Sequence, residues 1–305
     1  MNPSLEGYAA AIFEGAGPEE SASLSDELNS FKHLVGTSAP LRVTLADTSV
    51  AAAARRAIVW ELLEGKVSER ARRLAAYAVS AVRAPEVLSA LGWLSHRAGA
   101  AGGIELSLLG HIGARQRVGG YATAVFEEAG LAELEEVEDQ LFRFARIVES
   151  FPDLLAKMTD REVPAAARRA VVDDLLADKV EPATLRLAKF VVAGGRARDF
   201  VGLLDWLVER SADARGWRVA RVRAAEPLDD AQRNSLASAL SRLSGAPVDL
   251  QVTLDRALIG GVVVGIGNLR VDASARGRLE ALREELLPTG PDRGAGGHDR
   301  TRGRQ

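Results

Sequence analysis

The residue types that most often carry out chemistry are few in this sequence, and their spacing assembles no catalytic or metal site. The 305 residues include no cysteine, so disulfides and thiolate metal ligands are excluded. The four histidines are not at ligand spacing from one another, and we interpret them as surface or internally satisfied side chains. The sequence contains no paired carboxylates and no nucleophile elbow. It therefore predicts a protein that is not an enzyme and has no catalytic residues, cofactor or metal. The histidines are His33, His96, His111 and His298.

One glycine-rich segment shares some features with a phosphate-binding loop. Ile259–Gly267 contains four glycines. It lacks the Lys-Ser/Thr pair of a P-loop, and its last two glycines are not followed by a third at dinucleotide-binding spacing. Val262, Val264 and Ile266 alternate with a period of two, which is typical of a strand. We favour a hairpin with glycines at close backbone approaches over a ligand loop.

Arginine clusters are the remaining candidates for a binding surface. The pair Arg55-Arg56 recurs as Arg168-Arg169. Arginine pairs of this kind are explained by helix faces that are exposed to solvent. The more specific alternative is that they contact an acidic partner. A second cluster of arginines could form a binding surface along the edge of a strand, or its charges could protect an edge strand from aggregation. The formal net charge of −3 gives no electrostatic footprint for nucleic acid. The second cluster consists of Arg215, Arg218, Arg221 and Arg223.

An internal repeat organises the elements that would carry these residues. Ala53–Val67 recurs as Ala166–Val180, 113 positions later, with ten of fifteen residues identical. The same interval relates the dipeptides Gly7-Tyr8 and Gly120-Tyr121 without a gap. We interpret the chain as two copies of one folding unit followed by a different third unit.

Each copy has the apolar period of an amphipathic helix protein. Apolar residues at helical spacing predict about six helices per copy, joined by short loops into a bundle. In the second predicted helix of each copy the inward stripe is Leu24, Leu28, Phe31 and Val35, or Val137, Leu141, Phe144 and Val148. In the duplicated Ala-Arg-Arg helix, Ile58, Val59, Leu62 and Leu63 are predicted to face inward.

The third unit changes to a period of two. Strands are predicted at 217–225, 248–254 and 262–271, with a helix at 228–243 and a closing helix capped by Ser274. This order, β-α-β-β-α, predicts a small α/β domain. The fold class is therefore mainly α, with two tandem six-helix bundles and a small C-terminal α/β domain.

Glycine-rich stretches mark the expected boundaries. We place the first bundle at 1–112, the second at 113–213, the α/β domain at 214–287 and a disordered tail at 288–305. Glycines between about 99 and 120, including Gly119-Gly120, predict a linker. No apolar run approaches the roughly 18 residues of a membrane span, and the start lacks signal-peptide features. We expect a soluble protein of cytoplasmic origin.

Three segments of the chain are distinctive together, Gly120–Ala129, Asp255–Gly261 and Val262–Leu279. They resemble the delta subunit family of F-type ATP synthase, whose mitochondrial relative is the oligomycin-sensitivity conferral protein, and the resemblance covers about 117–287. Because the usual member has one bundle, the repeat at 4–98 suggests an enlarged, actinobacterial-type form with a duplicated N-terminal domain.

The resemblance implies a non-catalytic subunit of the peripheral stalk. Such a subunit connects the catalytic head to the membrane-anchored b subunits and resists rotation, and it supports ATP synthesis and hydrogen ion transport. The implied partners are the alpha-subunit N-terminal helices and the b subunit, with one copy per complex and no nucleic acid. The implied location is the cytoplasmic face of the plasma membrane, with membrane association only through the complex.

The resemblance also implies a binding groove for an alpha-subunit helix between the first and fifth helices of a bundle. An amphipathic helix in an apolar groove is a common recognition mode. The same residues fit a bundle core equally well. In the second copy the implied residues are Tyr121, Val125, Phe126, Leu187, Phe190 and Val191. A possible second groove in the first copy consists of Tyr8, Ile12, Phe13, Leu74, Tyr77 and Ala78.

An alternative function is a helical adaptor whose small α/β domain binds nucleic acid through the arginines near Trp217. The acidic overall charge and the lack of interleaved aromatics count against it.

Overall fold

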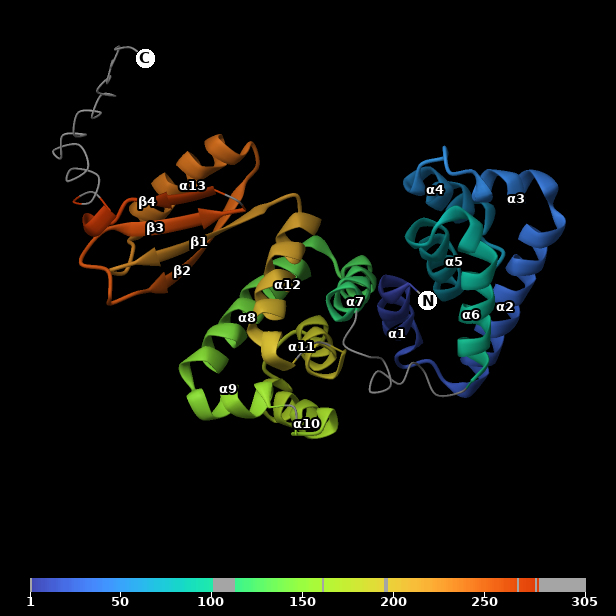
Figure 1. Cartoon of the computed structure of the whole chain (residues 1–305), viewed down its shortest axis with the longest axis horizontal. Helices are drawn as coiled ribbons and strands as arrows, with labels where there is room; N and C mark the ends of the chain where they lie inside the picture. The colour runs from blue at the N-terminus through green and yellow to red at the C-terminus, as the bar shows by residue number, and fades with distance from the viewer. Residues whose placement is uncertain are drawn as a thin grey trace, which may run out of the picture. The chain divides into compact units, whose positions relative to one another are not determined.

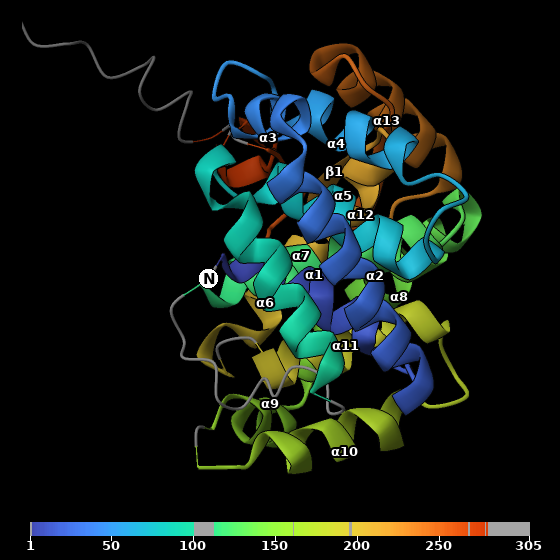
Figure 2. The same ribbon diagram turned by 90° about the vertical axis from the view of Figure 1, so that its right-hand side faces the viewer.

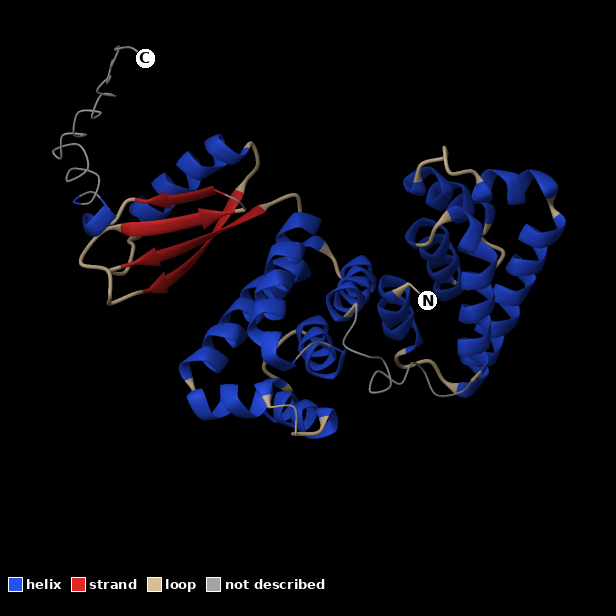
Figure 3. Cartoon of the chain, viewed as in Figure 1, coloured by secondary structure: helices blue, strands red, loops and turns tan. Residues whose placement is uncertain are grey.

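A computed structural model describes residues 2–100, 113–160, 162–194, 197–267, 269–277 and 279. The chain separates into two compact units, Met1–Trp217 and Arg218–Gln305. The first unit is helical and the second contains the sheet, as Figures 1 and 3 show. Within the described ranges, no helix is both long enough and apolar enough to cross a membrane. The chain is mainly helical, as the sequence predicted.

The N-terminal half of the helical unit contains six α-helices and one short 3₁₀ helix among its described residues. The helix starts follow from local sequence, since proline lies in the first turn of α1, α2 and α3, where its missing N–H is harmless. The Asn2 side chain also caps α1 by accepting hydrogen bonds from the N–H groups of Ser4 and Leu5. The elements are α1 (Pro3–Phe13), α2 (Pro18–Thr37), α3 (Ala39–Ala46), α4 (Ala52–Leu62), α5 (Glu69–Ala81), η1 (Ala84–Glu86) and α6 (Val87–Gly99).

The next stretch repeats this order. Each helix from α8 to α12 begins 113 residues after its counterpart among α2 to α6. The helix packing repeats as well, because α2 packs on α6 as α8 packs on α12, and α4 packs on α5 as α10 packs on α11. The elements are α7 (Ala114–Glu128), α8 (Leu131–Ser150), α9 (Pro152–Thr159), α10 (Ala165–Leu176), α11 (Pro182–Gly194), η3 (Ala197–Asp199) and α12 (Phe200–Ala214). We call residues 2–100 the first helical half and 113–217 the second helical half.

The predicted apolar stripes of α2 and α8 are confirmed, since all eight side chains are buried. The duplicated Ala-Arg-Arg helix differs in two details. Ile58 is 37% exposed, whereas Val59 and Leu63 are buried. Arg55, expected on a solvated face, is buried and donates hydrogen bonds to the carbonyl oxygens of Val79 and Val50. Arg55 therefore links the backbone at Val79 to the backbone at Val50.

The predicted linker is wrong at one end. Gly119 and Gly120 lie inside α7, where each accommodates a close neighbour. A Cβ atom at Gly119 would lie 2.9 Å from the Trp206 ring. Glycine here reflects packing space within a helix. Gly99 at the other end is the last residue of α6, and Ala114–Val118 belong to α7. The part of the predicted linker at 101–112 lies outside the described residues.

The second unit is a four-stranded mixed sheet with helix α13 and a helical turn at 275–277 among its described residues. The strand order is β2-β1-β3-β4. β1 and β2 run parallel with α13 as the crossover between them, and the pairs β1–β3 and β3–β4 are antiparallel. The elements are β1 (Arg218–Ala224), α13 (Asp230–Ser244), β2 (Val248–Leu254), β3 (Val262–Ile266) and β4 (Leu269–Asp272).

The predicted single strand at 262–271 is in fact the hairpin β3–β4. Gly267 has φ of 54°, a left-handed value that glycine tolerates, and Ile266 pairs with Leu269 across the turn. The side chain of Ser274 accepts a hydrogen bond from the Gly277 N–H, as predicted for a helix cap. The rest of the predicted closing helix, apart from Leu279, and the predicted tail at 288–305 lie outside the described residues.

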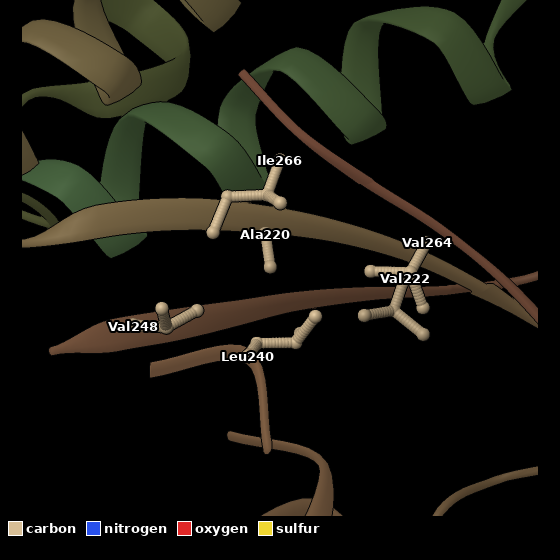
Figure 4. Packing of buried hydrophobic residues seen from close by; sticks show 6 residues of the cluster. All are labelled: Ala220, Val222, Leu240, Val248, Val264 and Ile266. Carbon is tan, nitrogen blue, oxygen red and sulfur yellow. The ribbon is translucent and has the colours of Figure 1, made fainter. Parts of the chain in front are cut away.

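Apolar side chains from the strands and α13 form the core of the sheet unit (Figure 4). Leu250 and Val252 of β2 are partly buried against this core, but Leu254 at the end of the strand is 60% exposed. Gln251, between Leu250 and Val252, is buried, so burial along β2 does not follow a strict period of two. The core residues are Ala220, Val222, Leu240, Val248, Val264 and Ile266.

Two leucines of α13 provide a test of this core. Leu240 is 3% exposed and Leu243 is 68% exposed. We expect Leu240→Ala to lower the free energy of opening the sheet unit by about 2–5 kcal/mol, because it leaves a cavity. Leu243→Ala should change it by less than about 0.5 kcal/mol. Amide hydrogen exchange of β1 and β3 measures this free energy, and equal effects of the two variants would contradict the described packing.

Candidate functional site

The two predicted grooves meet each other inside the helical unit. Helix α1 packs along α7 more extensively than any other pair of described helices packs, and both views of the chain place them side by side (Figures 1 and 2). α1 is the first helix of the first helical half, and α7 is the first helix of the second. We call this contact the α1–α7 crossing.

Two glycines set the distance at the crossing. A Cβ atom at Gly7 would lie 1.8 Å from the carbonyl oxygen of Arg117, and one at Gly120 would lie 1.8 Å from that of Ser4. Any larger residue would therefore collide with backbone. Glycine inside a helix costs about 1 kcal/mol relative to alanine, and this close approach is the physical reason for it at both positions.

Tyrosine and glutamate side chains bridge the crossing in both directions. The Tyr8 hydroxyl donates a hydrogen bond of 2.6 Å to Glu127. The Tyr121 hydroxyl donates one to Glu14. Tyr121 follows Tyr8, and Glu127 follows Glu14, by 113 positions. The two bonds are therefore the same interaction made twice, as in a twofold interface.

Two arginines repeat this pattern at the helix ends. Arg73 of α5 donates to the carbonyl oxygen of Ala124, at 2.6 Å, and Arg186 of α11 donates to that of Ala11, at 3.2 Å. Both arginines also donate to Glu128, at 2.8 and 2.7 Å. Such charge-assisted bonds are stronger than neutral ones. Each fifth helix therefore holds the C-terminal end of the other half's first helix.

Aromatic stacking fixes the tyrosine rings within each half. Tyr8 stacks on Tyr77 with ring centroids 3.8 Å apart, and Tyr121 stacks on Phe190 at 3.9 Å. Tyr77 and Phe190 occupy equivalent positions on α5 and α11. The pairs orient each hydroxyl toward the opposite half.

The residues predicted to line the two grooves are all buried in the free chain, none more than 9% exposed. Tyr8 and Tyr121 reach across the crossing through their hydroxyl groups. An external helix could therefore reach the Tyr8 and Tyr121 hydroxyl groups only where α1 and α7 separate, and the burial of the other residues fits a bundle core equally well. The buried set comprises Tyr8, Ile12, Phe13, Leu74, Tyr77, Ala78, Tyr121, Val125, Phe126, Leu187, Phe190 and Val191.

The crossing shifts the ionisation of its own groups. Burial, followed by the charge of Glu127, raises the pKa of Tyr8, and burial, followed by the charge of Glu14, raises the pKa of Tyr121. Burial is also the main cause that raises the pKa of Tyr77. Burial alone would raise the pKa of Glu128, but hydrogen bonds from Arg186 and Arg73 outweigh it and lower that pKa.

Sequence reasoning missed the glycine, glutamate and arginine members of this site. The signal was present, because Gly7, Glu14 and Arg73 recur at the 113-residue interval as Gly120, Glu127 and Arg186. Residues that both copies retain outside their apolar stripes make structural contacts, either within a half, as Arg55 and Arg168 do, or between the halves, as here.

A cavity of about 690 Å³ opens beside the crossing. Ser4 and Tyr77 of the first half and Trp206 of the second line it, and its volume falls in the range of small-ligand sites. Arg115 lies over the Trp206 ring at 4.9 Å. The cavity is therefore built from both helical halves.

Two of the four arginines behind the nucleic-acid alternative are engaged in ion pairs. Arg215 is nearly buried and pairs with Glu138 at 3.1 Å. Arg223 pairs with Asp255 at 3.1 Å. This arrangement does not support a basic binding face. Within the part of the chain that is described, no group of three or more His, Cys, Asp or Glu side chains could hold a metal ion.

These features describe a mainly helical protein. Its most extensive contact between described elements is the one between helices α1 and α7. A family model described as "ATP synthase delta (OSCP) subunit" matches residues 118–286, more than half of the chain. The chain therefore belongs to the ATP synthase delta (OSCP) subunit family.

Relatives that align with nearly the whole chain are named as the same subunit. The chain is 37% identical over 269 residues to "ATP synthase subunit delta" of Nocardia farcinica, an alignment that covers 87% of this chain and 90% of the relative. It is 32% identical over 278 residues to the protein of the same name from Salinispora arenicola, with 90% and 92% covered. For the Rhodococcus opacus protein the identity is 31% over 283 residues, with 93% and 94% covered.

The three tyrosines of the chain, Tyr8, Tyr77 and Tyr121, make the crossing observable. Their folded pKa values are raised above the unfolded value of about 10. Their contribution to stability is therefore fully present below about pH 10 and is lost as pH rises above it. An ultraviolet titration of the native protein should show no tyrosine ionising near pH 10, whereas denatured protein should show all three. Ionisation of any native tyrosine near pH 10 would contradict the described burial.

Glu128 provides the acid counterpart. Its folded pKa is lowered, so its contribution is present above the unfolded value of about 4.3 and is lost as pH falls through the folded pKa. Glu128→Gln should lower the free energy of unfolding at neutral pH, and the difference from wild type should shrink below about pH 4. Denaturant unfolding at both pH values measures this, with exposed Glu19→Gln as the control. A difference that is constant with pH would contradict the ion-pair assignment.

Proposed function

We propose that this chain joins the catalytic head of an F-type ATP synthase to the membrane-anchored b subunits. Through its family it is a peripheral-stalk subunit of that synthase. The proposed partners are the N-terminal helices of the alpha subunits on one side and the b subunit on the other. One copy per complex lies on the cytoplasmic face of the plasma membrane and is held there through the complex.

The observation that carries this proposal is the extent of the family match. It includes both the second helical half and most of the sheet unit, at residues 118–286. Alignment with a delta subunit also extends over 87% of the chain. A resemblance confined to helical repeats would define only a helical protein.

The proposed mechanism is mechanical, and the chain has no catalytic residue of its own. A stator must oppose the torque of the rotor without slipping, which requires joints whose contacts do not slide. Two helices resist sliding better when their backbones are in close contact and charge-assisted hydrogen bonds join them than when an apolar contact alone does. The hydrogen bonds require one relative position of the helices. The α1–α7 crossing supplies such a joint within the chain.

The helical unit is proposed to be a duplicated bundle domain. Equivalent helix starts at the 113-residue interval and equivalent contacts on both sides of the crossing support this. The proposed domains are a first bundle at 1–112, a second at 113–213 and the α/β domain at 214–287, with a tail at 288–305. The enlarged form would thus contain two copies of the domain that the usual member has once.

The proposed alpha-binding surface is the groove between α7 and α11, with the α1–α5 groove as a second site. Tyr121 and Phe190 belong to the first groove, and Tyr8 and Tyr77 to the second. Two equivalent grooves suggest that the chain binds two alpha-subunit helices. Calorimetry with an alpha N-terminal peptide tests the stoichiometry on the full chain, and a single site would exclude the two-site version.

Membrane vesicles from a strain that lacks this chain provide the direct test. We expect ATP hydrolysis to be released from the membrane and ATP-driven proton pumping to be lost, because the head is no longer held to the stalk. A tagged full-length copy should restore pumping and retain the alpha and b subunits on purification. Pumping that is unaffected by the deletion would overturn the proposal.

A further inference from the structure

The first helix of each helical half covers the surface of the other half that is proposed to bind a partner helix. We infer that the two proposed grooves are occupied within the chain, so that a partner helix binds only by displacing α1 or α7. This inference rests on the proposed groove function. It identifies the competing occupant of that site and the chemistry that a partner helix must reproduce.

The equivalence of the contacts supports mutual occupancy. α1 presents Gly7, Tyr8 and Glu14 to the second half, and α7 presents the equivalent Gly120, Tyr121 and Glu127 to the first. A surface that meets its own copy in this way is self-complementary. The surface that binds α7 on one side is therefore the same kind of surface that binds α1 on the other.

The occupants also define what the groove recognises. The glycine at the crossing is followed seven residues later by a glutamate, which is the C-cap residue Glu14 after α1 and Glu127 within α7. Seven residues are about two helical turns, so both residues lie on one face. The opposite half supplies a tyrosine hydroxyl and an arginine to the carboxylate, as Tyr121 and Arg186 do for Glu14. A competing helix therefore needs a small residue and, seven positions later, an acidic one.

Competition within one chain lowers the apparent affinity for an external helix. The apparent dissociation constant equals the intrinsic constant divided by the fraction of molecules whose groove is open. The crossing keeps this fraction small, because opening exposes buried tyrosines and breaks hydrogen bonds to charged groups.

Alanine at Gly7 opens the α7–α11 groove selectively. Gly7→Ala places a methyl group of α1 against the carbonyl oxygen of Arg117, and Gly120 on the groove itself is left unchanged. Alanine favours a helix more than glycine does, so α1 itself is not weakened. Gly36→Ala in α2 is the matched control, since its added Cβ has no atom within 4 Å.

The probe is a synthetic peptide of the alpha-subunit N-terminal helix, titrated into the full chain. We expect Gly7→Ala to bind it at least about tenfold more tightly than wild type. The Gly36→Ala control should bind as wild type does. Circular dichroism confirms that the variants are folded, and Glu14→Gln provides a second way to weaken the hold on α1 without changing the groove that receives the peptide.

The distance between two spin labels reports the displacement of α1 or α7 in a chain whose crossing residues are unchanged. The chain has no cysteine, so Ser30→Cys in α2 and Ser150→Cys in α8, both at exposed positions, accept spin labels specifically. Peptide binding to this otherwise wild-type chain should lengthen or broaden the distance between the labels.

The outcomes separate the inference from the function on which it rests. Tighter binding by the glycine variant together with a changed label distance supports displacement. Equal binding by all variants with an unchanged distance overturns the inference and leaves the alpha-binding function intact, with the helix on another surface. No binding by any variant overturns both the inference and the groove proposal.

Discussion

The α1–α7 crossing is the contact on which the helical unit depends. Two helices can approach until their backbones touch only where side chains are absent, and Gly7 and Gly120 provide this on each helix. The close approach brings Tyr8 and Tyr121 within hydrogen-bond distance of carboxylates on the opposite half. Because these groups are buried and paired, the crossing is specific in register as well as stable.

A stalk subunit benefits from this construction. An F-type ATP synthase stator carries load along a series of protein joints, and the weakest joint determines when it slips. The chain joins its helical halves through directional hydrogen bonds and ion pairs, and its sheet unit has a separate apolar core. If partner helices exchange with α1 or α7, the same recognition chemistry would serve both internal cohesion and assembly.

The helices were predictable because their apolar residues follow one period, and the stripe of Phe31 or Phe144 faces inward as expected. The interval of 113 residues likewise indicated the repeated helix order. The crossing was not predictable, because periodicity describes how a helix meets its own bundle and not how two bundles meet. Glycine content therefore predicts a linker at Gly119-Gly120, which lies inside α7, and the apolar alternation predicts one strand at 262–271 because it continues through the turn at Gly267.

Amide hydrogen exchange on the assembled synthase tests the central claim that the two halves occupy each other's groove. In the free chain, α1 and α7 should both be protected. In the complex, α1 or α7 should exchange faster than in the free chain, while the fifth helix of the groove it has left stays protected beneath the bound partner helix. Unchanged protection of both α1 and α7 on assembly, with alpha subunits bound, would contradict the claim.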